Sequence, residues 1–378
     1  MRGTVRERQP GVWEVRVYVG RDPVTNAPRQ VSRTVRGGKR AAQSKVAELV
    51  AEAKQGRLGG TDASVALLLE RHLEALARKG SSASYLYRVR GLVDGKIRPT
   101  LGAKTVRKLT AWDLDNFYAG LADEGLSASS IRQAHAVLSG ALGQAVKWGW
   151  VPLNVAKAAS PPVVRSARIV PPTVDEVRAL VAAAERRDPV LAALVMLAAI
   201  IGARRGELCA LRWTDVDLGA GTVRISRSVM DLPGRVEEKS TKTHQERTVA
   251  LGDVGVALLG AHRGQVLERA KLGEADLAPD AFVFSARLDG ASPVRPGTVS
   301  KFFGRVRDEL ELPHVHLHSL RHFMATQLAA RGDVSARTLA GRLGHADASV
   351  SLKVYSAFFP PADLEAADHV GRVLAPAP

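Results

Sequence analysis

The sequence predicts a multidomain α+β protein with a small sheet plus one helix first, an all-helical part next, and a larger, mainly helical part with a small antiparallel sheet last. Three observations predict this class. The chain has 378 residues, more than the roughly 100–200 of one ordinary domain. Two segments without periodicity, GRLGGTDAS and AASPPVVRSARIVPP, read as joints. Strand-like alternation occurs only near the start and in the second half, and helical spacing dominates elsewhere.

Residues 1–60 are predicted to form the first domain. Apolar and polar side chains alternate from Trp13 to Val19, QVSRTVRG predicts a second strand, and the segment from Lys39 to Gly56 predicts a helix. This domain has 13 Lys and Arg against 5 Asp and Glu, which favours a DNA-binding module over a merely soluble basic one. We expect its cations to point outward where a groove reader needs them. The candidates are Arg16, Arg33, Lys39 and Arg40.

The rest of the chain divides at a proline-rich linker. Residues 61–160 show about four helical segments and no strand pattern. Residues 161–172 are predicted to be the linker. In residues 173–378, Thr173 and Glu176 form a capping-box pattern, three short strands are expected between residues 221 and 251, and a short helix is expected in the tail after Pro361.

The composition limits the partners and the compartment. The net charge of +16 and the pI near 10.4 favour a polyanionic partner, nucleic acid before an acidic membrane or protein surface. The single cysteine, Cys209, excludes an intrachain disulfide and favours a reducing cytosol. The N-terminus lacks an apolar signal stretch, and the longest apolar run, residues 190–201, is too short to span a bilayer. We therefore expect a cytoplasmic protein.

The first candidate chemical motif is GARRGELCALRW. Arg204 can grip a phosphate through its fork of donors, and Glu207 lies one helical turn later, where it can hold that guanidinium. A surface salt bridge is the alternative reading. Arg205 is a neighbouring alternative to Arg204 as the phosphate ligand.

Two further motifs add a lysine and a second arginine. Lys242 lies in a polar loop between two expected strands, where an ammonium can protonate a departing alkoxide; an exposed hairpin lysine is the alternative, and Lys239 could also reach the loop tip. In HSLRH, His318 and Arg321 are three apart on a helix, so a proton carrier and a second phosphate ligand would share a face. The histidines here also raise a metal reading, but the glutamate of HExxH is missing, and we expect no metal and no cofactor.

The last motif, LGHADASVSLKVYSAF, contains a histidine and a tyrosine ten residues apart. A phenol with its ordinary pKa of about 10 is a poor nucleophile at neutral pH. Surrounding cations favour its phenolate and neutralise charge on an attacked phosphate. We therefore interpret Tyr355 as a nucleophile that forms a covalent phosphotyrosine, with His345 and the other basic residues as its activators.

Taken in order, these motifs resemble the tyrosine recombinase (phage integrase) family, and the basic N-terminal part is similar to the arm-site-binding domain of lambda-type integrases. The resemblance covers nearly the whole chain. It implies a SAM-like core-binding domain over residues 61–160 and a catalytic domain over residues 173–378. The catalytic residues that it implies are Arg204, Lys242, His318, Arg321, His345 and Tyr355, with Glu207 supporting Arg204.

The implied activity is integration or excision of a mobile element such as a prophage, by transesterification through a 3′-phosphotyrosine without ATP or metal. The implied partners are double-stranded DNA at core and arm sites and three further copies of the chain in a tetramer, with room for a host DNA-bending protein and an excisionase. The alternatives are an Xer-like chromosome-dimer resolvase, another tyrosine recombinase of transposon type, a type IB topoisomerase, and a regulator that has lost catalysis.

Overall fold

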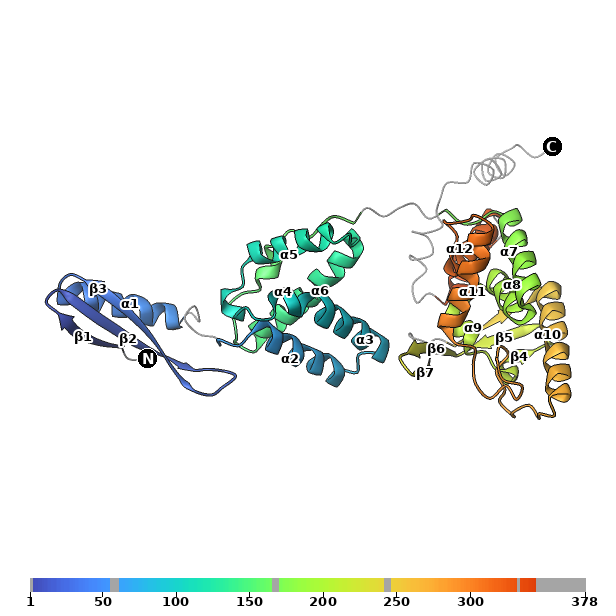
Figure 1. Ribbon diagram of the computed structural model, residues 1–378, viewed down its shortest axis with the longest axis horizontal. Coiled ribbons are helices and arrows are strands. Elements are labelled where there is room, and N and C mark those ends of the chain that lie inside the picture. The colour runs from blue at the N-terminus through green and yellow to red at the C-terminus, as the bar shows by residue number, and fades with distance from the viewer. Residues whose placement is uncertain (1–2, 55–60, 165–169, 241–245, 332–333, 345–378) are drawn as a thin grey trace, which may run out of the picture. The chain divides into compact units, whose positions relative to one another are not determined.

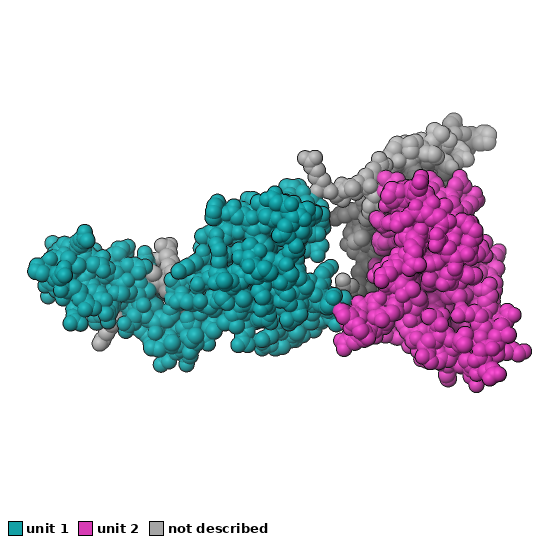
Figure 2. Space-filling view, viewed as in Figure 1, with its two compact units in different colours: residues 1–167 teal, residues 168–378 magenta. Residues whose placement is uncertain are grey.

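The chain forms two compact units, residues 1–167 and 168–378 (Figure 2). The computed structural model describes residues 3–54, 61–164, 170–240, 246–331 and 334–344. Buried apolar side chains gather in separate clusters: one in the N-terminal sheet domain, one among the helices that follow, and a large one with a small neighbour in the second unit. The multidomain α+β class is therefore confirmed.

The N-terminal domain is a three-stranded antiparallel sheet with one helix on one face (Figure 1). Val15 and Val17 on the central strand are fully buried against Ala42 and Leu49 of that helix. The first strand was not predicted, because its sequence GTVRERQ is mostly polar. Its Val5 pairs with Val15 of the central strand, a contact that is visible only in the folded sheet. The elements are β1(Gly3–Gln9), β2(Val12–Arg21), β3(Pro28–Arg36) and α1(Lys39–Lys54).

The next part is entirely helical, as predicted. Its helices begin at side-chain caps that the sequence supplies: the hydroxyls of Ser64, Ser82, Thr110 and Ser127 each accept a hydrogen bond from a backbone N–H in the first turn. Fully buried Leu69, Leu114, Ile131 and Leu138 lie in its core. The helices are α2(Val65–Arg78), α3(Ala83–Leu92), α4(Arg98–Leu101), α5(Ala111–Asp123) and α6(Ala128–Lys147), with a π-turn over Val93–Ile97.

The second unit is built around the apolar helix α8(Pro189–Ile201). Asp188 caps its start by accepting from the backbone N–H groups of Val190 and Leu191, and Gly202 ends it in the left-handed conformation. Leu194 and Leu197 are fully buried, and each contributes about 1.5–3 kcal/mol by leaving water. The other helices among the described residues of this unit are α7(Val174–Arg187), α9(Arg205–Cys209), α10(Gly252–Leu272), α11(Pro296–Glu309), α12(Leu317–Ala330) and α13(Ala336–Leu343).

The strands of the second unit form two small antiparallel sheets rather than one. The predicted strand over residues 221–230 is divided, because the chain leaves one sheet after Ile225 and enters the other at Arg227. One sheet has the order β4-β5-β8 and the other is the hairpin β6-β7. The strands are β4(Val216–Asp217), β5(Thr222–Ile225), β6(Arg227–Leu232), β7(Arg235–Ser240) and β8(Arg247–Ala250). The predicted capping box at Thr173 and Glu176 is present.

Candidate active site

Arg204 stands where α8 ends and α9 begins. Gly202 has φ +64°, and a Cβ there would lie 2.1 Å from the Met324 methyl carbon, so the turn needs glycine. The chain then runs extended through Arg204, whose backbone N–H donates to Glu207 Oε2 at 2.9 Å and whose Nη1 donates to Oε1 at 2.9 Å. The Arg204 side chain remains 46% exposed. The predicted contact between Arg204 and Glu207 is thus present, and the guanidinium keeps an open side.

Glu207 is not part of a surface salt bridge, because its side chain is only 3% exposed and a second arginine binds it. Arg247, at the start of β8, donates from Nη2 to Oε2 at 2.6 Å and from Nη1 to Oε1 at 3.4 Å. Burial alone would raise the pKa of Glu207, but the hydrogen bonds and charge of Arg247, together with the bonds from Arg204, hold that pKa below its usual value. Glu207 is therefore an ionised carboxylate shared by two guanidinium groups.

Arg321 contacts the same junction from another helix, α12. On α12 it is 3% exposed; its Nη1 donates to the Gly202 carbonyl and its Nη2 to the Leu343 carbonyl, both at 2.7 Å. His318, one turn earlier, is exposed, and its ring meets His322 edge-on with centroids 5.0 Å apart. Burial and the charge of Arg321 lower the pKa of His322. The described residues thus place Arg204, Glu207 and Arg321 at one junction of α8, α9 and α13, with His318 at the open start of α12.

Three predicted catalytic residues, Lys242, His345 and Tyr355, lie outside the described residues. The elements that lead to them are described. β7 ends at Ser240 and β8 begins at Arg247, on either side of the segment that contains Lys242. Gly344, with φ +64°, ends α13 immediately before His345.

Salt bridges attach the β6-β7 hairpin to the body of the unit. On β6, Asp231 accepts from Arg295 Nη2 at 2.8 Å and from the Gly297 N–H at 3.0 Å. On β7, Glu238 accepts from Arg212 Nη2 at 2.9 Å. Lys239, the alternative lysine, lies on β7 itself, 3.7 Å from the Glu237 carboxylate and 29% exposed.

The sequence raised two further alternatives, Arg205 as the phosphate ligand and a bound metal ion. Arg205 donates to the Ser300 hydroxyl on α11. Within the described parts of the chain, no group of three or more His, Cys, Asp or Glu is arranged to hold a metal ion, and no described helix has the length and apolarity to span a bilayer. Cys209 is buried, and burial raises the pKa of its thiol to about 12.

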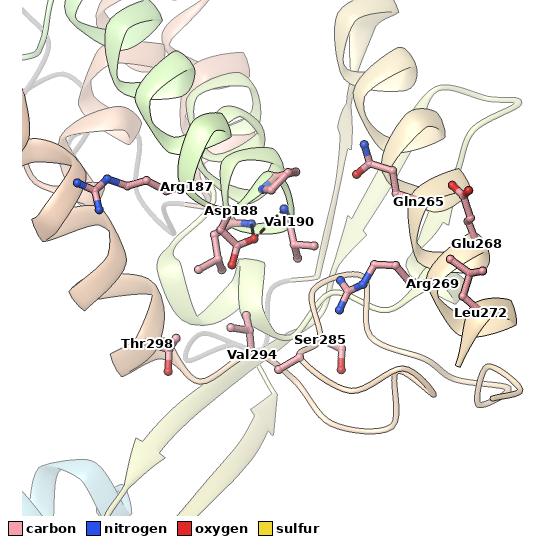
Figure 3. A pocket seen from close by; sticks show the side chains of 13 residues that line it. Arg187, Asp188, Val190, Gln265, Glu268, Arg269, Leu272, Ser285, Val294 and Thr298 are labelled. Carbon is pink, nitrogen blue, oxygen red and sulfur yellow. Dashed lines mark hydrogen bonds between the residues drawn. The ribbon is translucent and has the colours of Figure 1, made fainter. Parts of the chain in front are cut away.

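A hollow of about 620 Å³ in the second unit is lined by other residues (Figure 3). Arg187 and Asp188 line it at the start of α8, Glu268 and Arg269 line it from α10, and Thr298 lines it from α11. None of the predicted catalytic residues is among its lining residues.

The DNA-binding candidates of the N-terminal domain are all exposed but do not share one face. Arg16 pairs with Ser32 on the sheet face opposite α1, whereas Arg33 pairs with the buried Val15 and so belongs to the face that α1 covers. The register of the sheet therefore places the two exposed strand arginines on opposite faces. Lys39 and Arg40 are exposed at the start of α1.

Arg247 is the residue that sequence reasoning missed. It begins the predicted strand RTVAL, and its partners Glu207 and Arg342 are 40 and 95 residues away. Only its position at the first residue of that predicted strand could have pointed to it.

Comparison with known proteins gives one consistent answer. The Phage integrase family model matches residues 173–359, nearly all of the second unit. A tyrosine recombinase XerC-like protein of Caldanaerobacter subterraneus subsp. tengcongensis is 28% identical over 45% of this chain and 46% of its own length, so the match spans about half of that relative. A putative prophage phiRv2 integrase of Mycobacterium tuberculosis is 26% identical over 70% of this chain and 67% of its own length.

Solved structures of lambda integrase have the same fold. A dimer bound to a COC′ core site matches with a TM-score of 0.60 and 21% identity over 93% of this chain and 94% of the integrase. A tetramer bound to a Holliday junction matches with a TM-score of 0.60 and 20% identity over 94% and 96%. With the matched family model and the arginine–glutamate junction that the sequence motifs predicted, the chain belongs to the phage integrase family, the tyrosine recombinases.

Proposed function

We propose that the chain integrates or excises a mobile DNA element by cutting and rejoining DNA through a 3′-phosphotyrosine on Tyr355. The observation that carries this proposal is the junction at which Arg204 and Arg321 are both held in place, with Glu207 buried and ionised beside them. Two fixed cations stabilise the charge that grows on the oxygens of an attacked phosphate without reorganising during the reaction.

The chemistry assigns each remaining residue a task. Tyr355 attacks phosphorus, the bond to the 5′ oxygen breaks, and Lys242 donates the proton that this oxygen needs as it leaves. His318 and His345 position groups and carry protons near neutral pH. Because one phosphodiester replaces another, the energy of the DNA bond is kept in the protein–DNA link and no ATP is required.

We also propose a division of labour among the domains. Residues 61–160 and 173–378 bind the core site, residues 161–172 connect them, and residues 1–60 bind a separate arm site. The exposed Arg16 on the open sheet face and the exposed Lys39 and Arg40 at the start of α1 support a DNA-binding role, since a helix N-terminus also favours phosphate. Binding two DNA sites through one chain raises the effective concentration of the weaker one. The working assembly is a tetramer on DNA, the state in which lambda integrase was solved on a Holliday junction.

The mobile-element role is proposed over a chromosome-dimer resolvase because of the N-terminal domain. A separate sheet and helix with its own buried core precedes the core-binding helices, and a resolvase that acts at one core site has no need of an arm-binding module. We place the reaction in the bacterial cytoplasm, on the host nucleoid.

The test is a nicked duplex that carries the core site, identified from the junctions of the element that encodes the chain. Because the nick lets the 5′-OH strand diffuse away, we expect a protein–DNA adduct that survives SDS. Tyr355→Phe should bind the duplex as tightly as the natural protein and form no adduct. An adduct of undiminished yield from this variant would place the nucleophile on another residue, and no adduct from the natural protein would reject the enzymatic proposal.

A further inference from the structure

We propose that Arg247 is a positioning residue for the reaction: it keeps Arg204 available for the phosphate and holds the end of α13 beside it. The inference rests on the proposed function, because it takes Arg204 to be a phosphate ligand. It concerns a residue that none of the sequence motifs singled out.

Arg247 joins three distant segments through one buried side chain. Its guanidinium donates to both oxygens of Glu207, at 2.6 Å and 3.4 Å, and its Nε donates to the Arg342 carbonyl at 3.0 Å. The side chain is 8% exposed. A planar fork of donors can make these three bonds at once, and a lysine ammonium cannot reproduce that geometry.

The charge count explains why Arg204 depends on Arg247. Glu207 is one negative charge in a site that is 3% exposed, and a buried carboxylate needs a compensating cation. Arg247, itself buried, provides it. Arg204 then has only one of its terminal nitrogens on Glu207, at 2.9 Å, while its side chain is 46% exposed. Without Arg247, Glu207 would draw the Arg204 guanidinium inward, away from its exposed position. Alternatively, Glu207 would take up a proton, and Arg204 would lose its anionic partner.

The other end of Arg247 fixes the chain ahead of His345. A Cβ on Gly344 would lie 2.8 Å from Arg247 Nη1, so this glycine lets the guanidinium come close as well as ending α13. Arg342 Nη2 in turn donates to the Ile200 carbonyl at 3.0 Å. Arg247, Arg321 and Arg342 therefore fasten residues 342–344 to residues 200–207 by three separate arginine bridges.

The experiment compares adduct formation and DNA binding for four variants of the full-length chain. Single-turnover cleavage is measured on the nicked core-site duplex at saturating protein, and binding is measured by fluorescence anisotropy of the same duplex. In Arg247→Met, cleavage should fall about 100-fold, the size expected for a catalytic group misplaced by about 1 Å, with the dissociation constant changed less than about threefold, since the buried Arg247 is not proposed to touch DNA. The cleavage rate of Arg247→Lys should lie between those of Arg247→Met and the natural protein.

The double variant Glu207→Gln with Arg247→Met separates an effect of Arg247 on catalysis from an effect on the stability of the fold. Removing both charges of a buried pair often leaves stability nearly unchanged, so its melting temperature should recover while cleavage remains low. Leu180→Ala, a core truncation on α7, is the control for lost stability and should cleave normally below its melting temperature. If the double variant cleaves at the natural rate, Arg247 serves folding only and the proposal fails. If Arg247→Met cleaves normally, it also fails. If the natural protein itself does not cleave the duplex, the proposed function is rejected instead.

Discussion

Glu207→Gln should destabilise the second unit far more than an equivalent change at the surface. The substitution keeps the size of the side chain but leaves Arg247 buried without a counter-charge, and breaking a buried ion pair on one side costs about 3–5 kcal/mol. The burial that justifies this figure is 3% exposure for Glu207 and 8% for Arg247. Converted to an equilibrium, it is a factor of roughly 150 to 4,000.

Glu309→Gln is the matched control. Glu309 also accepts from two arginines, Arg187 at 2.7 Å and Arg186 at 3.4 Å, but its side chain is 36% exposed. A solvent-exposed pair contributes about 0–1 kcal/mol, which corresponds to a factor of up to about five. Residue type and number of arginine partners are the same, so burial is the variable that differs.

The assay is amide hydrogen exchange of the full chain, read on peptides from α8. Amides in this buried helix exchange by large-scale opening, so their rates report the unfolding free energy of the second unit, separately from the other domains. We expect Glu207→Gln to raise these rates at least about 30-fold relative to Glu309→Gln. Equal rates in the two variants would refute the argument that the junction is a buried, charge-balanced cluster.

The pH dependence of the same exchange follows from the lowered pKa of Glu207. A carboxyl whose folded pKa lies below its unfolded value stabilises the fold above the ordinary pKa, about 4.5 here, and loses that contribution as the pH falls through the lowered folded value. The natural protein should therefore lose protection in α8 below that ordinary pKa. Glu207→Gln should lack this component of the acid transition.

Three further outcomes are expected. Lys242→Ala should cleave slowly on ordinary DNA but normally on a duplex whose leaving 5′ oxygen is replaced by sulfur, because a thiolate leaves without a proton; Lys239→Ala should be near normal on both, and the reverse pattern would make Lys239 the acid. Deleting residues 1–60 should spare cleavage of an isolated core site but reduce recombination between complete attachment sites, and equal efficiency would reject arm binding. EDTA should leave strand exchange in purified protein nearly intact, and strong inhibition would show that a metal takes part.

Local chemistry explains why much of the fold could be predicted. Helix starts carry their own signals, as at Thr173 and Asp188, where the capping side chain and its target N–H groups are two or three residues apart. α8 is recognisable because nearly every position is apolar. β1 has no such local signal, since it forms a strand by pairing with β2. The boundary between β5 and β6 is likewise not local, because the two strands belong to different sheets.

The same distinction separates the predictable part of the site from the rest. Arg204 and Glu207 are one helical turn apart, so their contact follows from spacing alone. Arg247 reaches Glu207 across 40 residues, and no periodicity in the sequence encodes that meeting. Gly344 shows the limit most clearly: its left-handed φ could be expected of a helix-ending glycine, but its closeness to the Arg247 guanidinium depends on the packing of α13 against β8. The proposed phosphate ligands can therefore be recognised as sequence motifs, whereas a distant contact such as that of Arg247 with Glu207 becomes visible only when the chain is folded.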